Sequence, residues 1–127
     1  MLKLKKVIRE ILPAKIQYSG DTDHFELYQI NPTQEYRKYM YMGIDSLHRM
    51  GWDVNKDRYA LMYTDKISSK ITAEDIFIRF NRDIPRNFRG RSMSVSDILV
   101  LCIGGKRTTY YVDSIGFTEL PDNFWES

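Results

Sequence analysis

Residues 98–112 constrain the fold more than any other stretch of this chain. The first arm, Ile98–Ile103, reads ILVLCI and is therefore apolar on both faces of a strand. Such a strand is covered on both sides and lies inside a sheet rather than at its edge. Gly104 and Gly105 supply the positive φ of a tight reversal, and the return arm, 108–112, is β-branched and aromatic. The sequence therefore predicts a central β-hairpin.

Three other patterns predict helices. An amphipathic helix is predicted over 1–13, because residues 4–12 place apolar side chains at helical spacing with basic residues opposite and Pro13 ends the pattern. We expect the helix to dock on the sheet, with a membrane surface or a partner groove as the alternative. A short helix is predicted at 44–50, where Ile44, Leu47 and His48 stand at helical spacing and Gly51 ends the helix. Another begins after Thr72, since Asp75 stands three residues later in the capping-box position.

Aromatic-rich or alternating stretches predict strands at 25–30, 36–42 and 58–64. Near the end of the chain, Phe124 and Trp125 are expected to pack back on the body. A chain of 127 residues is one domain by the usual relation of length to domain number. The sequence therefore predicts a single α+β domain over 1–127, with a mainly antiparallel sheet and two or three short helices besides the N-terminal one.

The cysteine content and the hydropathy indicate the cellular compartment in which the protein is expected. Cys102 is the only cysteine, so no internal disulfide can form, which fits a reducing cytosol. The N-terminus lacks the continuous apolar run of a secretory signal, and no segment approaches the ~20 apolar residues of a membrane span. We therefore expect a cytoplasmic protein with no membrane partner.

The sequence shows no set of residues that predicts catalysis or metal binding. His24, His48 and Cys102 lack the close spacing of metal ligands. Cys102 is expected to be buried in mid-strand, where a thiol is an unactivated hydrophobe. We therefore assign no catalytic residue, no cofactor and no metal, and we expect a protein that is not an enzyme.

A row of short polar residues precedes the central strand: Ser92, Ser94, Ser96 and Asp97. Side chains of this kind commonly form hydrogen bonds within turns, and this is the interpretation that we favour. The alternative is an exposed row that contacts a ligand.

Arginines gather between residues 79 and 91, where five of them stand against one acid. Arginine binds phosphates and carboxylates in bidentate fashion and stacks on aromatic rings. The segment is either a solvated loop that pairs with the acids following Arg107 or a surface for a protein or a nucleic acid. The net charge of +2 argues against a nucleic acid as the first choice. The candidate partner-binding residues are Arg79, Arg82, Arg86, Phe88, Arg89 and Arg91.

Long motifs in the second half of the chain resemble the YodL-like domain family. They are SMSVSDILVL at 92–101 and YYVDSIGFTELPDNF at 110–124, preceded by RFN at 79–81. Similarity continues more weakly upstream, so that the resemblance covers residues from about 25 to 127. The resemblance implies a setting in low-GC Gram-positive bacteria and their mobile genetic elements, near antirestriction-type genes. The family has no established catalytic residues, so the resemblance implies none here.

This setting implies a protein that binds and blocks a host protein. We expect a non-enzymatic inhibitor of a host defence nuclease, either an anti-CRISPR protein directed at a Cas9-type ribonucleoprotein or an antirestriction protein. Nucleic acid is the secondary partner. The alternatives are a nucleic-acid-binding accessory or regulatory protein of the element and an inhibitor of host cytoskeletal or cell-shape proteins. The tyrosine-rich strands leave a homodimer open.

Overall fold

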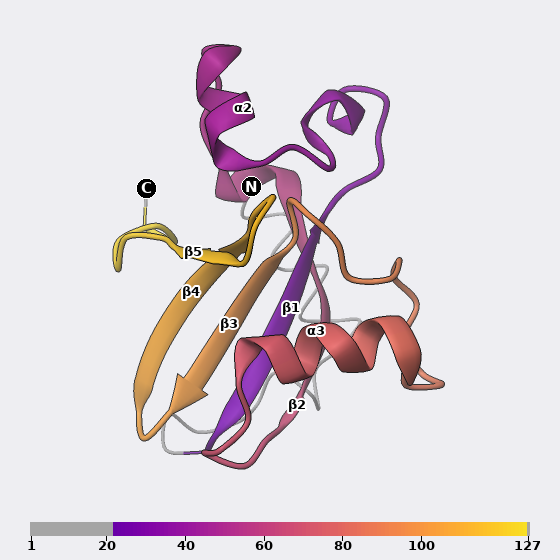
Figure 1. Ribbon diagram of the computed structural model, residues 1–127, viewed down its shortest axis with the longest axis vertical. Helices are drawn as coiled ribbons and strands as arrows, with labels where there is room; N and C mark the ends of the chain where they lie inside the picture. Colours follow the sequence, from indigo (N-terminus) through magenta and orange to yellow (C-terminus); the bar gives the residue numbers. More distant parts are fainter. Residues whose placement is uncertain (1–21, 127) are drawn as a thin grey trace.

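The computed structural model describes residues 22–126, which form one domain around a five-stranded antiparallel sheet (Figure 1). The strand order is β2-β1-β3-β4-β5, so β3 lies in the middle with two strands on either side. The predicted α+β class and antiparallel sheet are confirmed, and the helix expected at 1–13 lies outside the described residues. The strands are β1 (His24–Ile30), β2 (Tyr59–Lys66), β3 (Ile98–Ile103), β4 (Lys106–Val112) and β5 (Phe117–Glu119). The helices are α2 (Ile44–Arg49), α3 (Ala73–Arg82) and the 3-10 helices η1 (Arg37–Tyr39) and η2 (Lys56–Arg58).

The central hairpin has the predicted form. Gly104 and Gly105 take φ values of 60° and 79°, and the strands pair from Ile103 opposite Lys106. Strand β4 therefore begins two residues before the predicted start of the return arm. Leu99 and Val100 point to opposite faces and both are fully buried, as expected for a strand covered on both sides.

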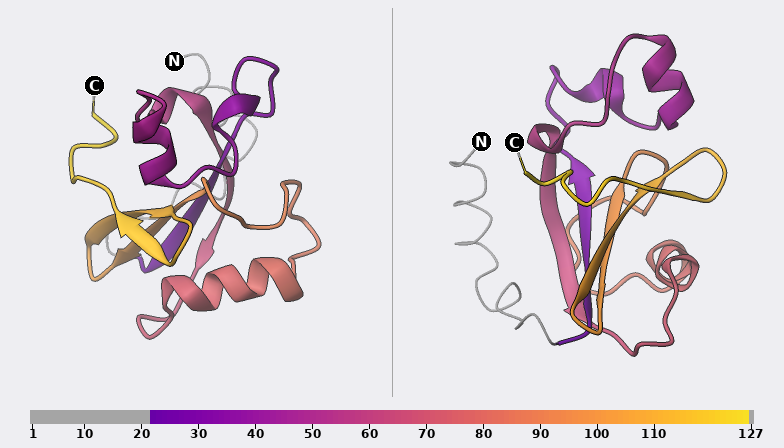
Figure 2. Two further views of the ribbon diagram at one scale, coloured as in Figure 1. Left: turned by 45° about the horizontal axis from the view of Figure 1, so that its top comes forward. Right: turned by 90° about the vertical axis from the view of Figure 1, so that its left-hand side faces the viewer.

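One face of the sheet is covered by α3, which lies across the strands (Figure 2). Phe80 from the helix packs against Phe25 from β1, with the ring centroids 5.9 Å apart and edge to face. Ile76 is buried beside it, whereas Phe77 is half-buried. Leu27 and Leu99 complete the centre of this core.

The predicted capping box at the start of α3 is confirmed. The Asp75 backbone N–H donates to Thr72 Oγ1 at 3.2 Å, and the Thr72 N–H donates to the Asp75 carboxylate at 2.9 Å. The Thr72 backbone and side chain both hydrogen-bond to the Asp75 carboxylate and hold its pKa below the usual value. These reciprocal bonds satisfy donors that the first turn of the helix leaves unpartnered.

The opposite face of the sheet carries a second core. Val100 and Tyr111 are fully buried there, under Leu47 from α2 and Leu120 after β5. The C-terminal segment packs back on this face, as predicted. Trp125 Nε1 donates a hydrogen bond to Thr109 Oγ1 at 2.9 Å.

The strand predicted at 36–42 is wrong, because this segment contains η1. The Thr33 carbonyl accepts hydrogen bonds from the Tyr36 and Arg37 N–H groups at 3.1 and 3.0 Å, which closes a turn. Tyr41 then takes φ 67°, outside the extended region. Tyr39 packs its ring 4.9 Å from Trp52, so these aromatics cover the end of the second core instead of a sheet position.

None of the helices within residues 22–126 is long and apolar enough to span a membrane.

Candidate interaction surface

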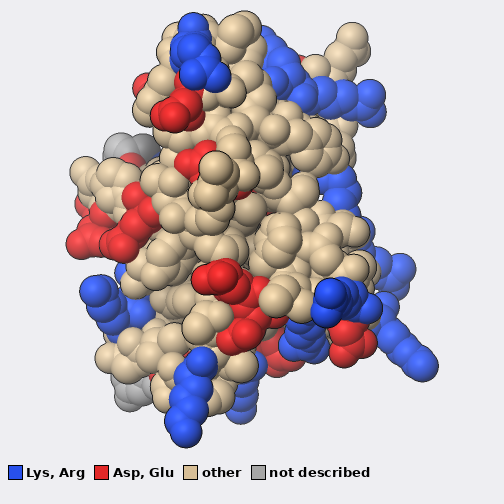
Figure 3. All heavy atoms as spheres, viewed as in Figure 1, with Lys and Arg blue, Asp and Glu red and all other residues tan. Residues whose placement is uncertain are grey.

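Four of the candidate arginines form an exposed group at the C-terminal end of α3 and in the loop that follows it. Their blue side chains gather over this part of the molecule in Figure 3. Within residues 22–126 none of the four takes part in an ion pair, so they are not neutralised by the C-terminal acids. Their guanidinium groups are therefore available to carboxylates or phosphates of another molecule. The four are Arg79, Arg82, Arg86 and Arg89.

The other two candidates point inward and hold the loop. The Phe88 ring packs edge to face on Phe80 and Tyr63, with centroids 5.0 and 6.0 Å away. The Arg91 backbone N–H donates to Gln29 Oε1 at 3.0 Å, and Arg91 Nη2 donates to the Ile30 carbonyl at 3.1 Å. The two residues therefore fix the backbone that displays the exposed arginines.

Asp97 is buried and bonds to the residues that hold this loop in place. Its Oδ2 accepts hydrogen bonds from Gln29 Nε2 at 2.9 Å and from the Ser94 N–H at 3.0 Å. The Gln29 amide also donates to the Arg91 carbonyl at 2.9 Å. Burial raises the pKa of the Asp97 carboxyl to about 7, although these hydrogen bonds and the charge of Arg91 oppose the shift. The carboxyl thus joins β1 to the segment between α3 and β3.

Ser96 has a structural position as well. It takes φ 85°, its Oγ accepts from the Tyr41 N–H at 2.9 Å, and its carbonyl accepts from Tyr59 Oη at 2.6 Å. Ser96 and Asp97 are 2% and 1% exposed, so they cannot contact a ligand at the surface. The turn interpretation of this row therefore holds for these two residues.

A polar cluster that the sequence analysis missed lies on the sheet face opposite α3. The Glu26 carboxylate accepts hydrogen bonds from Tyr28 Oη at 2.7 Å and from Arg107 Nη1 and Nη2 at 2.9 Å each. His24 Nε2 lies 3.0 Å from the same carboxylate. Burial alone would raise the pKa of Glu26, but the hydrogen bonds and charge of Arg107 outweigh it and lower the pKa. Glu26 is therefore held ionised.

The same cluster contains the ligand types of a metal site. One ligand atom each from His24, Glu26 and Cys102 lie within 4.8 Å of one another. However, the Arg107 guanidinium already neutralises Glu26, and its Nη1 lies 3.7 Å from Cys102 Sγ. Arginine thus provides the positive charge that a metal ion would supply, and the geometry favours an ion-pair cluster.

The cysteine in this cluster is not an activated nucleophile. Burial, together with the charge of Glu26, raises the pKa of the Cys102 thiol. Cross-strand pairing places Cys102 opposite both His24 and Arg107. The only local signal for the cluster is the alternation of His24 and Glu26, which puts both on one face of a strand.

The model of the YodL-like domain matches residues 24–124. The chain belongs to the YodL-like domain family. No curated protein and no solved structure matches it.

In this YodL-like domain the motif residues near the C-terminus support the fold. Tyr111 Oη donates to the Met42 carbonyl at 2.6 Å. Asp113 accepts from the Ile44 N–H, at the start of α2, at 3.1 Å and from Thr118 Oγ1 at 2.6 Å. These contacts outweigh the effect of burial and lower the pKa of the Asp113 carboxyl. The YodL-like motif therefore ties α2 to the β4–β5 turn.

Proposed function

We propose that this YodL-like protein is a non-enzymatic counter-defence protein that binds a host defence nuclease in the cytoplasm and inhibits it stoichiometrically. The observation that carries the proposal is the group of four exposed arginines without an internal ion pair. The choice of a nuclease rests on the mobile-element setting that the family resemblance implies. The target is a Cas9-type effector, which makes the protein an anti-CRISPR, or a restriction enzyme, which makes it an antirestriction protein.

The arginines stand on a support that is already ordered. Phe80 fixes the end of α3 in the core, and Phe88 and Arg91 fix the loop beyond it. Ordering a surface before it binds reduces the conformational entropy that binding must remove. The arrangement suits recognition of an acidic protein surface or of the guide RNA phosphates of a ribonucleoprotein.

The buried reactive groups also support binding over catalysis. The Cys102 thiol is buried and its pKa is raised, which disfavours the thiolate. Asp97 is enclosed and its carboxyl accepts hydrogen bonds from the fold itself. We therefore assign inhibition to contact alone.

The test is inhibition of guide-loaded Cas9-type nucleases and restriction enzymes by the full chain. We expect activity to fall linearly with added protein and to reach its minimum at one protein per nuclease. Replacing Arg82, Arg86 and Arg89 by alanine should weaken the complex by about tenfold or more, since interfacial charges contribute roughly 0.5–1 kcal/mol each. A control with the same change in charge replaces the exposed Lys66, Lys70 and Lys106 by alanine and should bind as the wild type does.

Two results would count against the proposal. The first is the absence of any complex with these nucleases at micromolar concentration. The second is full inactivation by a small fraction of one equivalent, which would identify an enzyme.

The same four arginines favour a second candidate, a nucleic-acid-binding accessory protein of the mobile element. This candidate predicts that the protein alone binds DNA or RNA, with an affinity that falls steeply with salt because each phosphate contact releases counterions. Fluorescence anisotropy with labelled oligonucleotides at several salt concentrations separates the two candidates. The nuclease inhibitor should show little binding to free nucleic acid at about 150 mM salt.

A further inference from the structure

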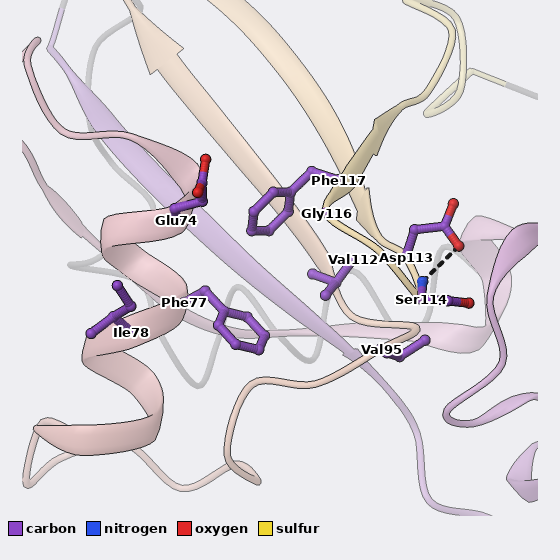
Figure 4. A pocket seen from close by; sticks show the side chains of 9 residues that line it. All are labelled: Glu74, Phe77, Ile78, Val95, Val112, Asp113, Ser114, Gly116 and Phe117. Carbon is purple, nitrogen blue, oxygen red and sulfur yellow. Dashed lines mark hydrogen bonds between the residues drawn. The ribbon is translucent and has the colours of Figure 1, made fainter.

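A pocket of about 380 Å³ opens between α3 and the turn that joins β4 to β5. Figure 4 shows Phe77 of the helix and Phe117 of β5 on its walls, with Val112 and Val95 on the side towards Asp113 and Ser114. The rings of Phe77 and Phe117 lie edge to face with centroids 6.3 Å apart. The interior is therefore apolar, and its volume falls within the range of pockets that bind ligands, about 300–1,000 Å³.

Apolar surface continues beyond the mouth of the pocket. Ile78, which lines it, is 50% exposed, and Ile115, at the tip of the adjoining turn, is 94% exposed. A small ligand inside the pocket would leave Ile115 in water, whereas a protein surface could cover both the pocket and Ile115. Large apolar side chains exposed beside a pocket are typical of protein interaction sites. The occupant is therefore a segment of a protein.

The charges around the pocket determine which sign of charge the bound segment should carry. The lining contains two acids and no lysine or arginine. Glu74 stands at one end, is exposed and forms no ion pair within residues 22–126. Asp113 lies at the other end, where its carboxylate accepts a hydrogen bond from the Ser114 N–H (Figure 4) and further bonds from Ile44 and Thr118. A cation beside the apolar group would be attracted from both ends.

We propose that this pocket binds a peptide segment of a partner protein in which a large apolar side chain stands beside a lysine or arginine. The apolar side chain packs against the rings of Phe77 and Phe117, and the cation meets Glu74. Ile115 then packs against the surface of the partner outside the pocket. The site stands on its own observations, since none of the exposed arginines lines it and it selects the opposite charge.

The test uses the full chain labelled with ¹⁵N and a set of five-residue peptides. The first peptide has phenylalanine between arginine and lysine. The second replaces the phenylalanine by alanine, and the third replaces both basic residues by glutamate. We expect the first peptide to shift the backbone amide signals of Val95, Val112 and Phe117, and the other two to bind at least about tenfold more weakly.

Variants of the protein complete the test. Glu74→Lys should weaken binding of the first peptide by about fivefold or more, whereas Glu35→Lys, at an exposed position outside the pocket lining, should leave its affinity unchanged. Both positions lie at the surface, so both variants should fold.

Several results would overturn the proposal. One is equal affinity for the basic and the acidic peptide, and another is the absence of shifts at the pocket at millimolar peptide. Binding of indole as tight as that of the first peptide would make this a small-ligand site. Shifts of the same amides with protein concentration alone would show that a second copy occupies it.

Discussion

At the scale of single residues, buried polar groups join parts of this domain that are distant in sequence. Gln29 in β1 bonds to the Arg91 backbone through both atoms of its amide, and the Asp97 carboxyl bonds to Gln29 in turn. A buried polar group is costly unless it is hydrogen-bonded, so each member of this set depends on the others. The position of the arginine-bearing loop therefore depends on side chains that never reach the surface.

Asp97 should make the protein less stable as the pH rises from 5 to 8. Burial raises the pKa of its carboxyl from 3.8 to about 7, so between these values the unfolded chain has lost a proton that the folded chain keeps. The free energy of unfolding should therefore fall with rising pH across this window. Asp97→Asn keeps an oxygen acceptor but cannot ionise. Between pH 5 and pH 8 the wild type should lose about 2–3 kcal/mol more of its free energy of unfolding than this variant does, at about 1.4 kcal/mol per pH unit below the folded-state pKa. Urea denaturation at each pH measures this difference.

Groups with lowered pKa values, such as Glu26 and Asp113, make the free energy of unfolding rise with pH, and they do so at lower pH. They are present in both proteins and cancel in the comparison. Parallel pH profiles for the two proteins would show that Asp97 ionises in the folded state without cost.

The protein should be more stable with glycine at position 41 than with alanine there. Its φ of 67° is left-handed, which costs a residue with a Cβ roughly 1–2 kcal/mol, and its ring is 57% exposed, so packing returns little. Tyr41→Gly keeps the N–H that bonds to Ser96 Oγ and removes the strain. Its free energy of unfolding should exceed that of Tyr41→Ala by about 1 kcal/mol in urea titrations. Equal stability of the two variants would contradict the left-handed conformation.

At the scale of elements, the sequence predicts those parts that local rules determine. The hairpin of β3 and β4 follows from apolar alternation and two glycines, and the start of α3 follows from Thr72 and Asp75. The short β5 has no such local pattern, because its three residues become a strand only by pairing with β4. Strand 36–42 was wrongly predicted since its tyrosines suit a strand, while contacts with Trp52 and Ser96 decide otherwise.

The candidate site, too, is predicted by the sequence only where it depends on residues that are neighbours in the chain. Clustering of arginines in the sequence locates the exposed group, but it does not reveal that Phe88 and Arg91 turn inward, because their partners lie elsewhere in the chain. The Glu26–Arg107 pair joins residues 81 positions apart, so no local spacing pattern in the sequence predicts it. The pocket is likewise formed only when α3 and the β4–β5 turn come together.

The contact between α2 and the β4–β5 turn should be sensitive to one methyl group. A Cβ at Gly43 would overlap Ser114 Oγ and lie 2.7 Å from Asp113 Oδ1, although the φ of −72° suits any residue. Gly43→Ala should therefore lower the free energy of unfolding by about 1–3 kcal/mol. Adding Ser114→Gly should recover part of this loss, with Ser114→Gly alone as the control. A double variant no more stable than Gly43→Ala would place the strain elsewhere.

At the scale of the whole molecule, α3 separates two surfaces of opposite chemistry. In Figure 3 acidic side chains lie over its N-terminal end and basic side chains gather over its C-terminal end, where the exposed arginines stand. Glu74 and Arg82 are eight residues apart, which is about 12 Å along a helix. Substitutions at this separation usually act independently, so the arginine surface and the pocket can be tested one at a time.

Both surfaces depend on a single strand, which predicts that the two cores unfold together. Leu99 of β3 faces α3, whereas the only two tryptophans, Trp52 and Trp125, pack against the opposite core. Leu99→Ala should lower the free energy of unfolding by about 2–5 kcal/mol through the cavity it leaves. Because β3 belongs to both cores, tryptophan fluorescence should report the same loss as far-ultraviolet circular dichroism, with coincident urea transitions. A fluorescence midpoint that stays at the wild-type value while the circular dichroism midpoint falls would show that the two faces of the sheet unfold separately.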